Sequence, residues 1–455
     1  MPRGEAYLGT AVQRGANAAL VSTLDAFEQA LFVGLAAVYV PGGEEAFAEA
    51  VWRVCDAFYE HPTRYMKVVG VTGTNGKTTT AWLIRDMLRG LEVSAGYLGT
   101  LGFQVPGIER ELPNTTPFAV ETYGLLGEAR DAGVEVLAME VSSHALAQHR
   151  ADGIEFDAGI FTNLTQDHLD FHGTMEAYEA AKLRLFTDLP RLSSKPFMAV
   201  LNRDEPASFH IADRLSGPCI WFSEAFEADV WASEVAVSVD RISMTLRFGS
   251  SVERYPVAAP LGGGYNVQNL LAAVAGLVAI GYSPSEVASV VGKVRPVPGR
   301  FEPVANECGI GVLVDYAHTP DALEKLLRTV RSLKSGRVIT VFGCGGDRDR
   351  GKRPLMAAVA SSLSDLTVIT SDNPRTEDPS AILSDIASGM IAGASSVSIL
   401  DRGDAVLHAV TQAVPGDVVV LAGKGHENYQ IIGREKIHMD DRELARAGFA
   451  ARGCL

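Results

Sequence analysis

Cysteine and long apolar segments are both scarce in this sequence, and each scarcity excludes a class of protein. The five cysteines are scattered over 455 residues without a Cys-x-x-Cys pair. An odd number of thiols in a long chain favours reduced cysteines in a cytosol over a disulfide framework. The longest apolar runs have about eleven residues, whereas a membrane span needs roughly twenty. No N-terminal signal pattern is visible, so we expect a cytoplasmic protein without a membrane span.

Positive charge is also in short supply. Lys and Arg number 40 against 55 Asp and Glu, which gives a net charge of −15. This balance argues against a nucleic-acid partner or an acidic membrane surface, so any anionic substrate must be bound by local Lys and Arg residues. A zinc site is not expected either, because the histidines have no cysteine partners.

Helical apolar spacing alternates with short β-branched runs along most of the chain. This alternation predicts βαβ units, parallel sheets and an α/β fold. The predicted strands are residues 67–71, 134–141, 157–164, 311–316, 337–343, 366–372 and 417–423. Residues 240–257 instead alternate with period two, which predicts a local antiparallel hairpin.

Two boundaries divide the chain into three predicted domains. One lies near 60–67, just before a glycine-rich loop, and the other lies near 295–302, where prolines and a glycine interrupt the helical pattern. The predicted domains are therefore residues 1–65, 66–298 and 299–455. The first is short and opens in a helix-like stretch without a preceding strand, so we expect the chain to begin partway into its first domain.

A glycine turn after the first predicted buried strand has the composition of a phosphate-binding loop. It reads Gly73-Thr74-Asn75-Gly76-Lys77-Thr78-Thr79. In such loops the lysine binds the β- and γ-phosphates and the following hydroxyl binds Mg²⁺. The usual spacing would place a glycine at position 71, which is Val71. The structural alternative is a turn that only caps a helix.

Polar residues follow several other predicted strands. Glu140 ends a very apolar strand, where a carboxylate is costly unless it is paired or bound to a metal ion. His168 lies in a polar loop and is a candidate metal ligand, whereas Lys182 on an apolar helix is expected to extend its amine to solvent. Four polar loops after later strands, at 315–323, 343–354, 371–379 and 420–430, predict a second ligand site.

These motifs together resemble the Mur ligases and their folylpolyglutamate synthetase relatives. The shifted glycine loop is typical of that group, and "TNLTQDHLDFHGTMEAYEAAKLRLF", "DYAHTPDAL", "GGDRDRGKRPLM", "DNPRTEDP" and "AGKGHENYQ" resemble the branch that adds the third residue of the peptidoglycan stem peptide. The resemblance covers roughly residues 60–445. It implies an α/β, three-domain architecture: an N-terminal UDP-sugar domain, a central P-loop ATPase domain and a C-terminal Rossmann-like amino-acid domain.

The resemblance also implies the chemistry. ATP and Mg²⁺ are the expected cofactors, and UDP-MurNAc-L-Ala-D-Glu and a diamino acid are the expected small-molecule substrates. The peptide carboxylate becomes an acyl phosphate, which the amine of the amino acid attacks to form an amide. We expect a monomer. Because the family's DNPR motif goes with diaminopimelate, Arg375 favours that amino acid over L-lysine or L-ornithine.

Residue roles carried over from the family fall into four groups. The expected catalytic residues and metal ligands are Lys77, Thr78, Glu140, His168 and Lys182, with Lys182 carbamylated to N6-carboxylysine, which replaces the solvent-exposed interpretation. ATP is expected at Gly73, Thr74, Asn75, Gly76, Lys77, Thr78, Thr79, Asn163, Asn266, Asn269, Arg300 and Asp315. The UDP-muramoyl peptide is expected at Asn114, Thr115, Thr116, Ser142, Gln148 and Arg150. The amino acid is expected at Arg348, Asp372, Asn373, Arg375, Gly423 and Glu427.

Three alternatives compete with this hypothesis. A folylpolyglutamate synthetase shares the loop and the acyl-phosphate route, but it has no need of the DNPR and GKGHE motifs. A non-catalytic scaffold with the same fold would be expected to lose Lys77, Glu140, His168 or Lys182, and all four are present. A phosphate-loop switch protein would need a guanine-reading motif, which nothing in the sequence resembles.

Overall fold

The strands predicted from β-branched runs are all present. They are β3 (Lys67–Thr72), β7 (Val136–Glu140), β8 (Ala158–Phe161), β15 (Gly311–Asp315), β16 (Val338–Phe342), β17 (Leu366–Ile369) and β19 (Val418–Ala422). Every residue of β7, β16 and β19 is buried, as expected for parallel strands covered on both faces. The predicted hairpin is confirmed as well: β12 (Ile242–Phe248) pairs antiparallel with β13 (Tyr255–Ala259).

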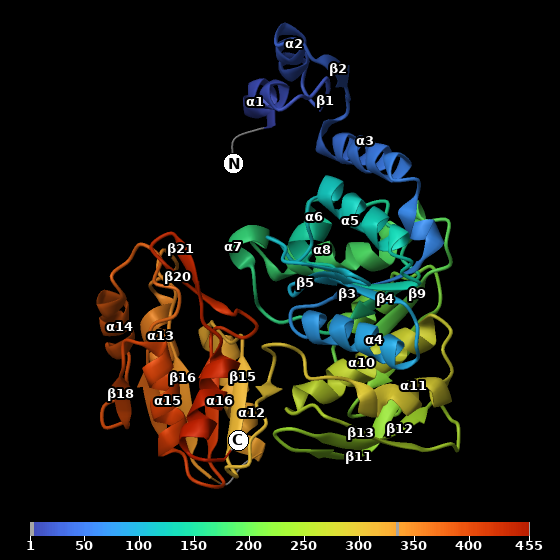
Figure 1. Cartoon of the computed structure of the whole chain (residues 1–455). Helices are drawn as coiled ribbons and strands as arrows, with labels where there is room; N and C mark the ends of the chain where they lie inside the picture. Colours follow the sequence, from blue (N-terminus) through green and yellow to red (C-terminus); the bar gives the residue numbers. More distant parts are fainter. Residues whose placement is uncertain (1–3, 334–335, 455) are drawn as a thin grey trace. The chain divides into compact units, whose positions relative to one another are not determined.

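The computed structural model describes residues 4–333 and 336–454, which form two units (Figure 1). Unit 1 runs to Trp231 and also contains Phe248–Ser250 and Leu271–Val287. Unit 2 contains Ala232–Arg247, Ser251–Leu270 and the chain from Ala288 onward. None of the helices in these described ranges is both long and apolar enough to cross a membrane.

Unit 1 begins with a small α/β segment. Its elements are η1 (Gly4–Tyr7), α1 (Leu8–Gln13), β1 (Ala18–Val21), α2 (Leu24–Phe32), β2 (Ala36–Tyr39), α3 (Gly43–Phe58) and η2 (Pro62–Tyr65). Strands β1 and β2 pair in parallel. Its small core cluster among the described residues consists of Leu8, Ala30 and Leu35. This segment therefore buries far less apolar surface than the sheet that follows it.

The larger sheet of unit 1 places β3 at a point where the strand order reverses. Its order is β10-β9-β8-β3-β7-β4-β5-β6, with parallel pairing from β10 to β4. A reversal of strand order leaves a crevice at the carboxyl edge, where α/β sheets bind ligands. The other elements are α4 (Lys77–Gly90), β4 (Ala95–Gly99), β5 (Gly102–Val105), β6 (Ile108–Arg110), α5 (Ala119–Asp131), α6 (Ser143–Ala147), α7 (Leu169–His172), α8 (Met175–Thr187), η3 (Leu189–Leu192), β9 (Met198–Asn202), α9 (Ala207–Ala212) and β10 (Cys219–Ser223).

Six elements belong to unit 2 wholly or in part before its main sheet begins. They are β11 (Val230–Val237), β12, β13, α10 (Tyr265–Ala279), α11 (Pro284–Val290) and η4 (Val291–Lys293). The main sheet has the order β14-β15-β19-β16-β17-β18, and all its pairs are parallel except β14–β15. Its further elements are β14 (Glu302–Pro303), α12 (Pro320–Leu333), α13 (Lys352–Leu363), α14 (Pro379–Ala387), β18 (Ser396–Ser398), α15 (Arg402–Gln412), β20 (Tyr429–Ile432), β21 (Glu435–His438) and α16 (Asp441–Ala451).

The main sheet of unit 2 is covered by helices on both faces. Alternate strand residues, such as Val420 on one face and Val419 on the other, belong to two separate apolar cores. Helices α12, α13 and α14 contribute to the first core, and α15 and α16 contribute to the second. This alternation with period two produces a doubly wound, Rossmann-like sheet.

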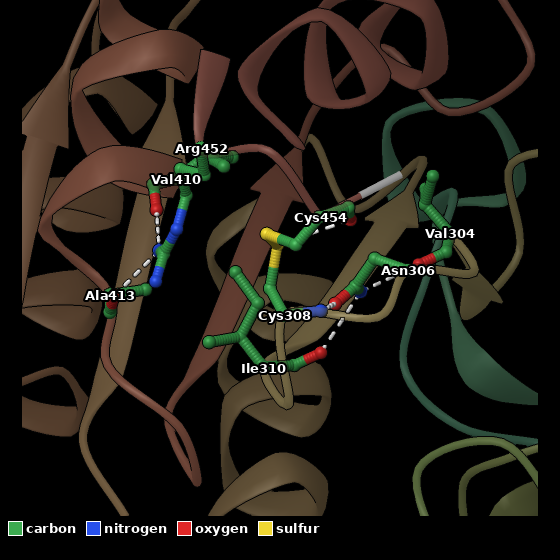
Figure 2. The surroundings of a disulfide bond; sticks show 8 residues. All are labelled: Val304, Asn306, Cys308, Ile310, Val410, Ala413, Arg452 and Cys454. Atoms are coloured by element: carbon green, nitrogen blue, oxygen red, sulfur yellow. Dashed lines mark hydrogen bonds between the residues drawn. A yellow bond between two sulfur atoms is a disulfide. The ribbon is translucent and has the colours of Figure 1, made fainter. Parts of the chain in front are cut away.

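The expectation of reduced cysteines is wrong for two of the five. Cys308 and Cys454 form a disulfide that joins the loop after β14 to the segment that follows α16 (Figure 2). Around it, the Asn306 side chain donates to the carbonyls of Val304 and Ile310. The two cysteines are 146 residues apart, so only the packing of α16 on the sheet brings them together. Cys55, Cys219 and Cys344 are free thiols.

A fully buried ion pair connects the two helices on one face of this sheet. Arg402, at the start of α15, donates from Nε and Nη2 to the two carboxylate oxygens of Asp441, at the start of α16, over 2.7 and 2.6 Å. Both side chains have 0% exposure. Arg402 also donates to the carbonyl of Ala422 at the end of β19. The pair therefore fixes both helix starts against the strand that leads into a candidate ligand loop.

We predict that Asp441→Asn lowers the free energy of unfolding by about 3–5 kcal/mol, because it leaves a buried guanidinium without its counter-charge. The matched control is Glu324→Gln, which breaks an exposed Arg–carboxylate pair on α12 and should change stability by less than about 1 kcal/mol. Urea unfolding followed by circular dichroism measures both. Equal small effects for the two variants would contradict the importance of the buried pair.

Candidate active site

The loop after β3 is built so that glycine is needed at position 73 and not at position 71. Val71 is a buried strand residue whose partners in register are Glu140 on β7 and Ile160 on β8. Gly73 has φ of +145°, and a Cβ there would lie 1.9 Å from the Thr162 hydroxyl oxygen. The strand thus continues through the position where the usual loop would begin, and the turn is correspondingly shorter.

The lysine of this loop begins helix α4 and folds back over the turn. Gly76 precedes it with φ of +86° as the N-cap. Lys77 Nζ donates to the carbonyls of Gly73 and Thr74, both over 2.9 Å. Backbone N–H groups at a helix start attract anions, so the loop, the helix start and the ammonium together form a phosphate cradle.

Asn163, which follows β8, holds this loop from the neighbouring strand. Its side-chain carbonyl accepts the Asn75 N–H over 2.9 Å, and its backbone carbonyl accepts the Thr74 N–H over 2.8 Å. Thr162 Oγ1 donates to the carbonyl of Asn75 over 2.6 Å. The structure therefore gives Asn163 a role in shaping the phosphate loop, in addition to the nucleotide contact expected from the resemblance.

Glu140 is the best-connected carboxylate of this site. It is fully buried at the end of β7 and accepts the Thr78 hydroxyl over 2.9 Å and the Thr100 N–H over 2.8 Å. The hydroxyls of Tyr97 and Thr100 donate to it as well. These donors compensate the buried charge, and the structure brings Thr78 and Glu140, two of the expected metal ligands, into direct contact.

His168 and Lys182, the two other expected metal ligands, share Tyr178 as a neighbour. The ring of Tyr178 lies 6.2 Å from that of His168 and 4.3 Å from Lys182 Nζ. Its hydroxyl lies 3.2 Å from Thr74 Oγ1 in the phosphate loop. Sequence analysis missed Tyr178, and its place one turn before Lys182 on α8 was the only available signal. His168 has φ of +52° and is partly exposed.

Lys182 is buried, contrary to the solvent-exposed interpretation. It is 1% exposed, and within the described part of the chain it has no ion-pair partner. Burial, and then the charge of Lys77, hold the pKa of the Lys182 amine well below its usual value. A neutral amine is a nucleophile, whereas an ammonium is not, so this environment is suited to the reaction of lysine with CO₂ that carbamylation requires.

A group of aromatic and histidine side chains lies beside His168. The ring of His144 is 4.8 Å from His168, 4.3 Å from Phe171 and 5.5 Å from His172. Burial, followed by the two neighbouring imidazoles, lowers the pKa of His144. This environment favours the neutral imidazole of His144. His172 contacts the Ser143 hydroxyl over 3.0 Å, so it connects α7 to α6.

The residues expected to bind the UDP-muramoyl peptide form a connected polar surface in unit 1. Thr116 donates to the carbonyl of Glu140 and accepts the Ser142 N–H. Arg150 donates to the carbonyl of Thr116 over 3.0 Å and to the side-chain carbonyl of Gln148. The Thr115 hydroxyl lies 3.1 Å from that of Thr100. Asn114 lies next to these residues in sequence and is half-buried.

The remaining expected nucleotide residues lie in unit 2. Asn269 donates to the side-chain carbonyl of Asn266, which donates to the carbonyl of Gly262. The guanidinium of Arg300 lies 5.0 Å from the ring centre of Tyr316. Asp315 accepts the N–H groups of Phe301 and Ala317, and its burial raises its pKa.

Four of the residues predicted to bind the amino-acid substrate meet where β17 and β19 end. Asn373 Nδ2 donates to Glu427 Oε2 over 2.9 Å. Asp372 is 9% exposed, and a Cβ at Gly423 would lie 3.0 Å from its carboxylate, so the glycine permits this close approach. Lys424, which sequence analysis missed, is fully buried beneath Asn373 and Glu427. A lysine between two glycines gave no signal of that burial.

Arg375 is held by the β20–β21 hairpin and by the loop before α13. It has φ of +51°, its N–H donates to the carbonyl of Ile431, and its carbonyl accepts the Gly433 N–H. Arg375 Nη1 donates to the carbonyl of Gly346 over 2.9 Å. Arg348, also predicted for this pocket, is exposed and donates locally, to the carbonyl of Asp347.

Two charged residues outside the predicted set fix the loop that carries Arg375. Buried Arg353 donates to both oxygens of Glu377 over 2.9 and 3.2 Å. Glu377 also accepts the Asp347 N–H over 2.6 Å. Its hydrogen bond from Arg353, together with these other donors, lowers the pKa of Glu377 to about 2. The pair therefore remains ionised at any working pH and joins the 343–353 loop to the 372–378 loop.

Family comparison agrees with this arrangement. The model of the Mur ligase middle domain matches residues 71–277. The model of the Mur ligase, glutamate ligase domain, matches residues 299–425. The chain belongs to the Mur ligase family. Its α/β fold is the three-domain Mur ligase architecture predicted from the resemblance, whereas the boundaries at 65/66 and 298/299 remain predictions.

Several proteins similar to this Mur ligase are named as diaminopimelate ligases. A UDP-N-acetylmuramoyl-L-alanyl-D-glutamate--2,6-diaminopimelate ligase of Geobacter sulfurreducens is 46% identical over 88% of this chain and 82% of its own. One of Geobacillus kaustophilus is 44% identical over 99% and 90%. A solved structure of a ligase with the same name matches with a TM-score of 0.71 and 32% identity, covering 97% of this chain and 94% of its own.

We predict that Lys77→Ala abolishes ATP turnover by this Mur ligase, because the γ-phosphate loses its main positive partner while charge develops on it. ADP release in the presence of both other substrates measures the effect. Lys325→Ala, which removes an exposed lysine paired with Asp321 on α12, is the control and should retain full activity. Normal ADP release by Lys77→Ala would exclude the loop as the site of phosphoryl transfer.

Proposed function

We propose that this Mur ligase joins meso-diaminopimelate to UDP-MurNAc-L-Ala-D-Glu at the expense of ATP, in peptidoglycan biosynthesis. The observation that carries the proposal is the pocket at the ends of β17 and β19. There the Asp372–Arg375 loop is held against Glu427, in a chain that shares 44–46% identity with relatives named for that activity. ADP release with the UDP-dipeptide and a panel of diamino acids tests it.

Phosphoryl transfer overcomes the poor reactivity of a free carboxylate. The terminal carboxylate oxygen of the dipeptide attacks the γ-phosphorus of ATP, and the bond from that phosphorus to the β,γ-bridging oxygen breaks to release ADP. The amine of the amino acid then attacks the acyl carbon. Inorganic phosphate leaves with the electron pair, and the nitrogen loses a proton to give the amide. Lys77 and the N–H groups that begin α4 bind the phosphates and orient the transferred group.

Magnesium fits the residues at this site. Thr78 and Glu140 supply hydroxyl and carboxylate oxygens, which Mg²⁺ prefers. No cluster of three His, Cys, Asp or Glu side chains that could hold a metal ion occurs among the described residues, and Mg²⁺ usually takes few protein ligands beside water and phosphate oxygens. Thr78 and Glu140 would hold one ion and His168 a second, and the ions would neutralise charge on the phosphates.

Lys182 is proposed to carry a carbamate. Its burial and low pKa supply the neutral amine that attacks CO₂; a new N–C bond forms, and one proton leaves. The product is an anion next to Tyr178 and the phosphate loop, which suits a cation-binding position better than an ammonium does.

We propose that the amino-acid pocket binds both charged groups at the distal end of diaminopimelate, its carboxylate and its ammonium. Arg375 and Asn373 offer N–H donors to the distal carboxylate, and a guanidinium is well suited to binding a carboxylate by two hydrogen bonds. The free oxygen of Glu427 then takes the distal ammonium. We also propose that the enzyme acts as a monomer in the cytoplasm.

We predict that Lys182→Ala is nearly inactive and that short carboxylic acids added to the assay partly restore its activity. The added acid replaces the anion that the carbamate provides. Steady-state ADP release with and without acetate measures the rescue. The control is Lys195→Ala, since Lys195 also lies in unit 1 but pairs with Asp157 and the carbonyl of Met66. Wild-type rates for Lys182→Ala would show that the lysine is structural.

We predict that Arg375→Ala raises the KM for meso-diaminopimelate and changes the KM for ATP little. Removing one partner of a charge-assisted pair typically costs about 2–5 kcal/mol, so the KM should rise by roughly 30-fold or more. Arg434→Ala, at the exposed turn of the β20–β21 hairpin, is the control. Faster turnover of L-lysine or L-ornithine than of meso-diaminopimelate by the wild-type enzyme would contradict the proposed substrate.

A further inference from the structure

Lys424 is a buried cation inside the proposed amino-acid pocket, and the proposed function assigns it no role. It follows Gly423 after β19, and its side chain has 0% exposure. Its Nζ donates to Glu427 Oε2 over 2.9 Å and to Asn373 Oδ1 over 3.0 Å. It therefore touches two of the residues proposed to bind the distal end of the substrate.

The first consequence concerns the side-chain amide of Asn373. Its oxygen accepts both Lys424 Nζ and the Ile431 N–H, the latter over 2.9 Å, and its nitrogen donates to Glu427. An amide nitrogen has two N–H groups, so only one remains for a ligand. Turning the amide over would break all three contacts, and Lys424 thus keeps the remaining N–H donor available to a substrate carboxylate.

The second consequence concerns the charge of Glu427. One of its oxygens accepts both Lys424 and Asn373, which leaves the other for a substrate ammonium. Lys424 lies closer to this carboxylate than a Debye length, and both side chains are largely out of water, so its charge offsets much of that of Glu427. Because the charges of Lys424 and Glu427 nearly cancel, the pocket suits a zwitterionic group better than a group with a net positive charge.

We propose that Lys424 is a positioning residue that makes the pocket prefer an amino acid with a zwitterionic distal end over one with a cationic distal end. The inference rests on the proposed function. The distal end of meso-diaminopimelate carries an ammonium and a carboxylate, whereas that of L-lysine carries only an ammonium. Without Lys424, the charge of Glu427 is not offset and the Asn373 amide loses one of the three contacts that fix its orientation, and both changes favour L-lysine.

The test compares kcat/KM for meso-diaminopimelate and L-lysine in Lys424→Met, which keeps most of the length of the side chain and removes its charge. We expect the ratio of the two values to fall at least tenfold, mainly through a higher KM for meso-diaminopimelate. The KM for ATP should stay within twofold. The matched control is Lys436→Met. Lys436 lies 3.7 Å from the ring of Tyr429, the same ring that Lys424 approaches to 5.3 Å, but it is on the exposed strand β21.

A second variant covers the case in which Lys424→Met does not fold. Glu427→Gln leaves Lys424 charged and without its carboxylate, so the inference predicts that discrimination against L-lysine increases at least threefold. An unchanged ratio in folded Lys424→Met, or a lower ratio in Glu427→Gln, would overturn the inference. A wild-type enzyme that prefers L-lysine would instead overturn the proposed function itself, so the two failures are distinguishable.

Discussion

A single buried carboxylate organises the phosphate-binding part of this Mur ligase. Glu140 ends β7 in full burial, where an unpaired charge would be prohibitively costly. Its compensation comes from Thr78 at the start of α4 and from Thr100 and Tyr97 at and after β4. Satisfying one charge thus fixes the helix that carries the phosphate loop, the turn after a neighbouring strand and the hydroxyl that would bind the metal ion.

The same logic recurs at the carboxyl edge of the sheet in unit 2. The loop after β17 is joined to the segment after β16 by the Arg353–Glu377 pair, and to the loop after β19 by hydrogen bonds of Asn373 with Lys424 and Glu427. Lys424 and Glu427 also pair with each other. Since charged pairs with good geometry are costly to break, these loops have little freedom. A net charge of −15 is therefore compatible with anionic substrates, because cations are concentrated where the strands end.

Sequence alone predicted the strands, because parallel strands such as β16 and β19 are buried on both faces and appear as short β-branched runs. It also predicted the phosphate loop, because few residue types fit a turn as tight as that of Gly73. It did not reveal the Cys308–Cys454 disulfide, the Arg402–Asp441 pair or the burial of Lys424. These three features depend on which helices and loops pack together, and the segments involved are far apart in the sequence. A local sequence pattern cannot predict such packing.

Two fully buried lysines show how the same side chain acquires different chemistry from its surroundings. Lys182 has an aromatic ring and another cation nearby but no ion-pair partner among the described residues, so its amine loses its proton readily. Lys424 instead donates to a carboxylate oxygen 2.9 Å away and to an amide oxygen at 3.0 Å. The first environment suits covalent modification by CO₂, and the second suits a fixed charge that orients its neighbours. The residues next to each lysine in the sequence do not distinguish it from a surface lysine. The groups that surround the amine in the folded protein therefore determine its chemical role.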